Sequence, residues 1–181
     1  MNRKLLLLTL FGIALVAMSI LLLVPKGAMF ENSELGLVVD GSVQHPLNLT
    51  LDEIAAMPKT TVNATLYCVG TPDRSLENGN WAGVRLAFLL ENAGVSPDAI
   101  KIAFYAKDGY TTDLTITQAE QENIILAYEK DGVPLPENLR LVVPGRWGYK
   151  WISQVNRIEL VNYDFKGFYE SSGYSDNAEV S

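Results

Sequence analysis

The segment LYCVGTPDRSLENGNWAGVRLAFLLENAGV, residues 66–95, contains the only cysteine of this 181-residue chain. Residues 61–68 alternate between polar and apolar side chains, which predicts a half-buried strand with Cys68 on its apolar face and at its end. The composition of residues 70–80 predicts a loop. Residues 83–95 carry apolar side chains at helical spacing and close near Gly94, so they predict a helix.

Short apolar runs separated by turn signals continue on both sides of this segment. Aspartate-glycine pairs at residues 40–41, 108–109 and 131–132 predict tight turns between strands. The strands are expected within residues 35–51, 99–116, 123–136, 139–145 and 152–165. A loop is expected over residues 146–151. The sequence therefore predicts a domain that is rich in antiparallel or mixed strands.

Two further short helices are predicted from capping boxes. Thr50 and Glu53 have the spacing of a capping box, and Pro58 ends the helix that they open. Thr117 and Glu120 have the same spacing. Because the helices are few and do not alternate regularly with the strands, an α+β fold is expected and a doubly wound parallel sheet is not.

The first 25 residues predict a single-pass membrane anchor. Residues 5–24 carry no charge and are long enough to span a bilayer as a helix, and Arg3 and Lys4 should stay on the cytoplasmic side. The run is longer than the apolar region of a cleavable signal peptide. We expect an anchor or uncleaved signal (1–25), a linker (26–36), one domain outside the cytoplasm (37–175) and a polar tail (176–181).

The composition of the remaining chain limits its partners and cofactors. After residue 24 there are 21 acidic and 12 basic residues, a net charge of −9, which argues against nucleic acid as a partner. The single histidine, His45, argues against a multi-histidine metal site, and the lack of a C-x-x-C-H motif argues against attached haem.

The residues alone leave the role of Cys68 open. Classical dinucleotide-binding, P-loop and nucleophile-elbow motifs are absent from the sequence. A cysteine protease would have to pair Cys68 with His45, and no flanking signature supports that pairing. Cys68 is therefore either an inert residue of an apolar strand face or a reactive group.

Three segments in order resemble a known family. They are residues 66–95, then KDGYTTDLTITQAEQENIILAYEKDGVPLP (107–136), then LRLVVPGRWGYKWISQVNRIEL (139–160). Together they are similar to the molybdopterin-binding oxidoreductase domain of the sulfite oxidase family. The resemblance covers about residues 36–175 and implies a mixed, mainly β fold with a molybdenum cofactor.

The resemblance also implies roles for particular residues. Cys68 occupies the position of the family's cysteine that gives a thiolate to molybdenum, and a soft thiolate suits a metal with sulfur ligands. The arginine of the LRLVVPG strand and the GYK loop approach the pterin and its phosphate in this family. The cofactor-binding candidates are Arg140, Arg146, Lys150, Trp151, Ile152 and Ser153. Tyr110 and Tyr149 are candidates for lining the pocket.

Three departures from the family pattern keep two functions in view. Ser153 replaces a second lysine of the family, the Asn- and Tyr-rich segment ahead of the domain is replaced by a short linker, and the N-terminus lacks a twin-arginine export signal. The first function is a membrane-tethered molybdenum oxidoreductase that transfers an oxygen atom and two electrons. It would act on a small oxyanion or sulfoxide-type substrate and pass electrons to a separate partner. The second is a cofactor-free module that binds a ligand or partner.

Overall fold

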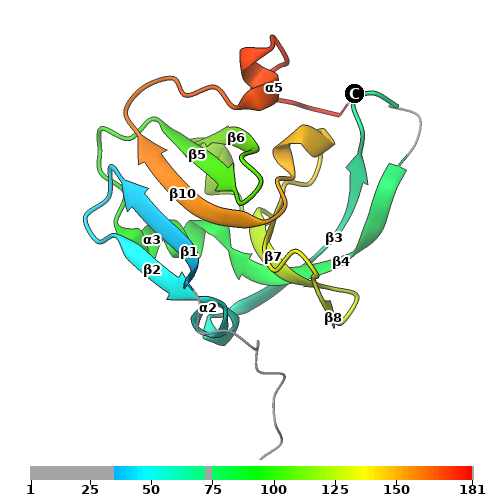
Figure 1. Ribbon diagram of the computed structural model, residues 1–181, viewed down its shortest axis with the longest axis horizontal. Helices are drawn as coiled ribbons and strands as arrows, with labels where there is room; N and C mark the ends of the chain where they lie inside the picture. Colours follow the sequence, from blue (N-terminus) through cyan, green and yellow to red (C-terminus); the bar gives the residue numbers. More distant parts are fainter. Residues whose placement is uncertain (1–34, 72–74, 181) are drawn as a thin grey trace, which may run out of the picture. The chain divides into compact units, whose positions relative to one another are not determined.

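The computed structural model describes residues 35–71 and 75–180 (Figure 1). The membrane anchor predicted over residues 1–25 and most of the predicted linker lie outside the described residues. Within the described ranges, no helix is long and apolar enough to cross a membrane.

The described residues form a mainly β fold built from two sheets (Figure 1). One sheet has the strand order β2-β1-β10-β5-β6, and the other has the order β3-β4-β7-β8, with β9 also paired to β7. The strands are β1 (Leu35–Gly41), β2 (Leu47–Thr50), β3 (Lys59–Tyr67), β4 (Ser75–Arg85), β5 (Lys101–Ala106), β6 (Thr111–Thr115), β7 (Ile125–Lys130), β8 (Val133–Pro134), β9 (Arg140–Val142) and β10 (Val155–Val161). The helices are α2 (Leu51–Ala56), α3 (Leu86–Ala93), α4 (Ile116–Ala119), α5 (Phe168–Ser171) and the 3₁₀ turn η1 (Gly148–Lys150). The predicted mixed, mainly β fold is thus confirmed.

The first sheet is mixed because one of its pairings is parallel. Strand β1 runs parallel to β10, with Val38 opposite Arg157, whereas the remaining pairs are antiparallel. The predicted hairpin between β5 and β6 is present, and Gly109 in its turn has a φ of 88°. Glycine adopts that left-handed conformation without a steric penalty.

The second sheet corrects the loop predicted over residues 70–80. Strand β4 begins at Ser75 and pairs along the whole length of β3. Polar side chains pair across this hairpin: Asn63 donates to Asn80 at 3.0 Å, and Asn78 donates to Thr65. Composition suggests a loop here because these residues are polar, yet their partners on β3 are polar too. Val84 likewise belongs to β4, so the helix α3 begins at Leu86, three residues after the predicted start.

One of the two predicted capping boxes is confirmed and the other is wrong. Thr50 accepts a hydrogen bond from the Glu53 backbone N–H at 3.2 Å, and the Glu53 carboxylate accepts from the Thr50 N–H at 2.8 Å. The box predicted at Thr117 forms instead at Thr115 with Gln118. Helix α4 therefore begins at Ile116, two residues earlier than the Thr117 box predicts, and ends at the buried Ala119.

A single hydrophobic cluster joins the two sheets and α3. Trp81 of β4 is a fully buried member of this cluster and donates from Nε1 to the Ala64 carbonyl at 3.2 Å. Its ring meets Trp151 edge-on, with the centroids 5.8 Å apart. Burial of one large aromatic side chain stabilises a fold by about 1.5–3 kcal/mol. This cluster therefore anchors β3, β4 and the segment around Trp151 to one another.

Residues 176–180, which the sequence assigns to a polar tail, pack on the domain. The Trp147 N–H donates to the Ala178 carbonyl at 2.7 Å, and the Val180 N–H donates to the Gly145 carbonyl at 3.0 Å. Ala178 is buried. The end of the described chain is therefore paired with the segment that leads into η1.

Candidate functional site

Cys68 follows the last residue of β3 and is partly exposed. The predicted alternation along this strand is present, since Ala64 and Leu66 are buried whereas Thr61 and Asn63 are exposed. The Thr71 N–H donates to the Cys68 carbonyl at 3.1 Å, so the chain turns sharply after the cysteine. The strand fixes the Cys68 backbone, and the turn leaves its thiol accessible.

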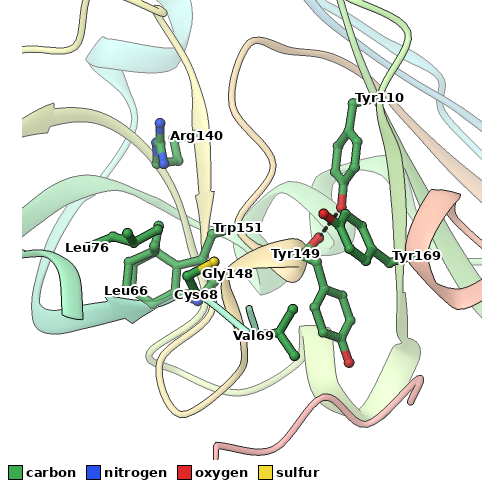
Figure 2. A pocket seen from close by; sticks show the side chains of 10 residues that line it. All are labelled: Leu66, Cys68, Val69, Leu76, Tyr110, Arg140, Gly148, Tyr149, Trp151 and Tyr169. Carbon is green, nitrogen blue, oxygen red and sulfur yellow. Dashed lines mark hydrogen bonds between the residues drawn. The ribbon is translucent and has the colours of Figure 1, made fainter. Parts of the chain in front are cut away.

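The thiol opens into a pocket of about 290 Å³ (Figure 2). Five segments that are distant in the sequence contribute to its walls: the end of β3, the start of β4, the start of β9, the η1 turn, and α5. A further side chain comes from the residue just before β6. The lining residues are Leu66, Cys68, Val69, Leu76, Tyr110, Arg140, Gly148, Tyr149, Trp151 and Tyr169.

The η1 turn lies directly against the end of β3. Tyr67 and Trp147 form an isolated parallel β-bridge. A Cβ atom added to Gly148 would lie 2.8 Å from the Tyr67 carbonyl oxygen and 3.2 Å from Leu66 Cδ2. Only glycine allows so close an approach of the two backbones. This contact places Tyr149 and Trp151 beside Cys68.

Arg140 is the cation that lines the pocket. Its Nε donates to Glu137 Oε1 at 2.7 Å, and its guanidinium carbon lies 5.7 Å from the centroid of the Trp81 ring. No residue of the described ranges accepts a hydrogen bond from its two terminal nitrogens. The backbone of Arg140 also forms an isolated antiparallel β-bridge with Ser153, which is half-buried. The guanidinium is therefore held in place and keeps donors for an anion.

Lys150 does not reach the pocket. Its ammonium is fully buried and lies 2.7 Å from Asp113 Oδ1 and 2.6 Å from Glu170 Oε1. Among the other sequence candidates, Arg146 pairs with Glu179 at 3.1 Å and Ile152 is a core residue. The structure thus brings Cys68, Arg140 and Trp151 together, keeps Ser153 beside Arg140, and directs Arg146, Lys150 and Ile152 elsewhere.

Three tyrosines form the wall of the pocket opposite Arg140, and we call Tyr110, Tyr149 and Tyr169 the tyrosine wall (Figure 2). The Tyr110 hydroxyl donates to the Tyr149 carbonyl at 2.7 Å. The rings of Tyr149 and Tyr169 stack, with centroids 5.4 Å apart and an angle of 20° between their planes. Burial raises the pKa of Tyr149 to about 12 and also raises that of Tyr110. Both phenols therefore stay protonated at neutral pH.

Sequence reasoning anticipated Tyr110 and Tyr149 as pocket candidates and missed Tyr169. Tyr169 lies in a C-terminal stretch of polar and aromatic residues. Its ring stacks on that of Tyr149, so the contact joins α5, which follows β10 in the sequence, to η1, which precedes β10. Leu76 was missed because residues 70–80 were predicted to be a loop. The sequence gives no signal for either contact, since both depend on the tertiary fold.

The comparisons with known proteins place the chain in a family. The family model described as "Oxidoreductase molybdopterin binding domain" matches residues 24–169. The chain therefore belongs to the oxidoreductase molybdopterin-binding family, and its domain is of the sulfite oxidase type. It is similar to an uncharacterized oxidoreductase, YuiH, of Bacillus subtilis (strain 168), with 34% identity over 142 residues that cover 76% of this chain and 71% of the relative.

Other relatives are longer than this chain. Sulfite oxidase of Arabidopsis thaliana is 26% identical over 171 residues, which cover 74% of this chain and 44% of that protein. In the solved structure of the sulfane dehydrogenase SoxCD from Paracoccus pantotrophus, the likeness has a TM-score of 0.66 at 24% identity and covers 70% of this chain and 38% of that one. The chain thus spans less than half the length of these two relatives. The likeness to SoxCD shows a shared fold alone.

The donors in the pocket fit part of the molybdenum cofactor that the family implies. An accessible thiol is a suitable ligand for a metal with sulfur ligands, and a fixed guanidinium with unused donors suits a phosphate or another anion. Cys68 and Arg140 therefore fit. Lys150 does not, because its ammonium is enclosed by two carboxylates.

Proposed function

We propose that this chain is a molybdenum-cofactor-dependent oxidoreductase in which Cys68 binds the metal. The observation that carries the proposal is the accessible Cys68 thiol in a pocket that Arg140 also lines, within a domain of the molybdopterin-binding family. When bound, the cofactor supplies a metal that exchanges an oxygen atom and two electrons with a substrate. The family resemblance supports a small oxyanion or sulfoxide-type substrate, and the Arg140 cation suits an anionic one.

The chain's own residues would divide the remaining tasks. Arg140 would orient an anionic group by hydrogen bonds from its terminal nitrogens. The tyrosine wall would exclude water on the opposite side, with the Tyr110 and Tyr149 hydroxyls already donating to the backbone carbonyls of Tyr149 and Ser175. Leu66, Val69 and Leu76 would give the pocket an apolar side.

The cellular setting is part of the same proposal. The uncharged residues 5–24 support a single-pass anchor with the domain outside the cytoplasm. In this proposal electrons pass to a separate partner in the membrane or outside the cytoplasm.

A second function is favoured by the state of Lys150. The enclosed ammonium and Ser153 in place of a lysine leave Arg140 as the cation that lines the pocket within the described ranges. A domain that kept the fold but lost the cofactor would bind a ligand or partner through the same pocket.

Elemental analysis separates the two functions. The full chain is expressed in a host that makes the molybdenum cofactor, purified, and assayed for molybdenum per protein. The enzyme requires a ratio near one molybdenum per chain, whereas a ratio near zero would leave the binding module.

A further inference from the structure

The buried ammonium of Lys150 has no donor left for a ligand. A lysine ammonium has three N–H donors. In this structure they meet the Asp113 carbonyl at 3.0 Å, Asp113 Oδ1 at 2.7 Å and Glu170 Oε1 at 2.6 Å. The side chains of all three residues are almost completely buried. Lys150 is therefore saturated by the protein itself.

The ion pair between Lys150 and Glu170 lies next to two members of the tyrosine wall in the sequence. Lys150 follows Tyr149 in η1, and Glu170 follows Tyr169 in α5. The pair joins the same two short elements whose tyrosine rings stack at 5.4 Å. Figure 2 shows Tyr149 and Tyr169 reaching the pocket from these two elements. The segment after α5 also contacts η1, since the Tyr149 hydroxyl donates to the Ser175 carbonyl at 2.7 Å, but the ion pair is the buried charged contact between the two elements themselves.

Glu170 is held from a third side by the sheet. The Thr112 hydroxyl of β6 donates to Glu170 Oε1 at 2.7 Å. A Cβ atom on Gly167 would lie 2.5 Å from Glu170 Oε2, so the segment before α5 closes tightly over the carboxylate. The carboxylate thus ties α5 both to η1 and to β6.

We propose that Lys150 is a positioning residue whose buried ion pair with Glu170 holds α5 against η1 and so fixes the tyrosine wall beside Cys68. In this role it contacts neither the cofactor nor the substrate. The inference rests on the proposed function only in treating the Cys68 pocket as the active site. It departs from the sequence-based expectation that Lys150 binds the cofactor.

The single cysteine makes the position of the wall measurable without any cofactor. Cys68 lies in the pocket, so its reaction rate with maleimides of different size reports how open the pocket is. The measured quantity is the ratio of the rate with a bulky fluorescein maleimide to the rate with N-ethylmaleimide. General loosening of the protein raises both rates, whereas movement of the wall raises the ratio.

The decisive variant is Glu170→Gln in the full chain, purified without cofactor. We expect the ratio to rise several-fold, because a neutral amide binds the Lys150 ammonium more weakly than the carboxylate does and so loosens α5. The matched control is Glu179→Gln, which removes an exposed ion pair with Arg146 from the same C-terminal segment and should leave the ratio unchanged. An unchanged ratio in folded Glu170→Gln would overturn the proposal.

A milder variant covers the case in which Glu170→Gln does not fold. Thr112→Val removes one hydrogen bond to Glu170 and keeps the shape of a buried side chain. It should raise the ratio in the same direction by a smaller factor, and no rise in the folded variant would contradict the proposal.

Molybdenum content supplies an independent readout. If Lys150 positions the wall, Glu170→Gln expressed with the cofactor should contain less molybdenum than the wild type. If Lys150 is instead a cofactor ligand that Glu170 restrains, Glu170→Gln should contain as much molybdenum or more, with an unchanged labelling ratio. Absence of molybdenum from the wild type would count against the proposed function and leave the labelling test intact.

Discussion

Cys68 is accessible because of where β3 ends. Leu66, two residues earlier on the same face of the strand, is buried, and a continued strand would direct residue 68 into the same core. The turn closed by the Thr71 N–H interrupts the strand at this point. Because of this turn, Cys68 lines the pocket and is a candidate metal ligand, although the strand pattern predicts a core position for it.

Arg140 is the second residue whose role can be tested alone. Arg140→Met should weaken retention of the molybdenum cofactor, since a hydrogen bond to a charged group contributes about 1.5–3 kcal/mol, which is roughly tenfold or more in affinity. The measurement is the molybdenum retained per chain after extended dialysis. Arg85→Met, at the end of β4 and outside the pocket lining, is the control. Equal retention by the two variants would remove Arg140 from the cofactor site.

At the scale of elements, the pocket depends on the contact between η1 and the end of β3. The β-bridge of Tyr67 with Trp147 and the close approach at Gly148 set the distance between these segments. Neither element is long enough to be stable by itself, so the contact is maintained by the surrounding core.

Gly148→Ala should therefore destabilise the domain. The added methyl group would lie 2.8 Å from the Tyr67 carbonyl oxygen, and such overpacking costs about 1–3 kcal/mol. Urea denaturation followed by tryptophan fluorescence measures the change. The control is Gly70→Ala, where the added atom would meet Cys68 Sγ at an ordinary 3.8 Å. A Gly148→Ala protein as stable as Gly70→Ala would show that η1 can move away from β3.

Local signals predicted some elements well and failed where tertiary contacts decide. The capping box at Thr50 could be predicted from the sequence because Thr50 and Glu53 lie within one helical turn. The box at Thr115 was misplaced because the overlapping pairs Thr115–Gln118 and Thr117–Glu120 have the same spacing, and the sequence pattern does not choose between them. The start of β4 was missed because its polar residues pair with polar residues on β3.

The same distinction applies to the site. Cys68, Arg140 and Trp151 were named from an ordered set of motifs, and all three line one pocket. The saturation of Lys150 by Asp113 and Glu170 depends on residues from three elements, so the motif containing Lys150 does not reveal it. Tyr169 was missed for the same reason.

At the scale of the whole domain, ion pairs fasten the C-terminal segment to the first sheet. The Lys101 ammonium of β5 lies 3.0 Å from Asp113, 2.7 Å from Asp164 and 2.9 Å from Asp176. Burial acts to lower the pKa of Lys101, but these three carboxylates outweigh it and raise the pKa above the ordinary value. Lys166 also pairs with Asp176.

The carboxylates of this network should make stability fall in acid. The hydrogen bond from Lys101 lowers the pKa of Asp164. Burial acts to raise the pKa of Asp176, but hydrogen bonds from Lys166 and Lys101 outweigh it and lower that pKa. Stability from groups with lowered folded pKa values is fully present above the ordinary carboxyl pKa of about 4. It is lost as the pH falls through the lowered values.

Urea denaturation between pH 7 and pH 3 tests this expectation, with the pH range set by the ordinary carboxyl pKa of about 4. Asp176→Asn should be less stable than the wild type at neutral pH and should lose less stability on acidification. Asp98→Asn, an exposed residue outside the ion pairs of the described residues, should follow the wild-type profile. Parallel profiles for all three proteins would exclude Asp176 from the acid response.

We propose that Cys68 supplies a sulfur ligand to molybdenum. X-ray absorption at the molybdenum edge measures it most directly, on the full chain loaded with cofactor and on Cys68→Ser prepared in the same way. We expect the variant to show one sulfur neighbour fewer at the metal, or to lose the metal altogether. A variant that keeps its molybdenum with the wild-type number of sulfur neighbours would contradict the account.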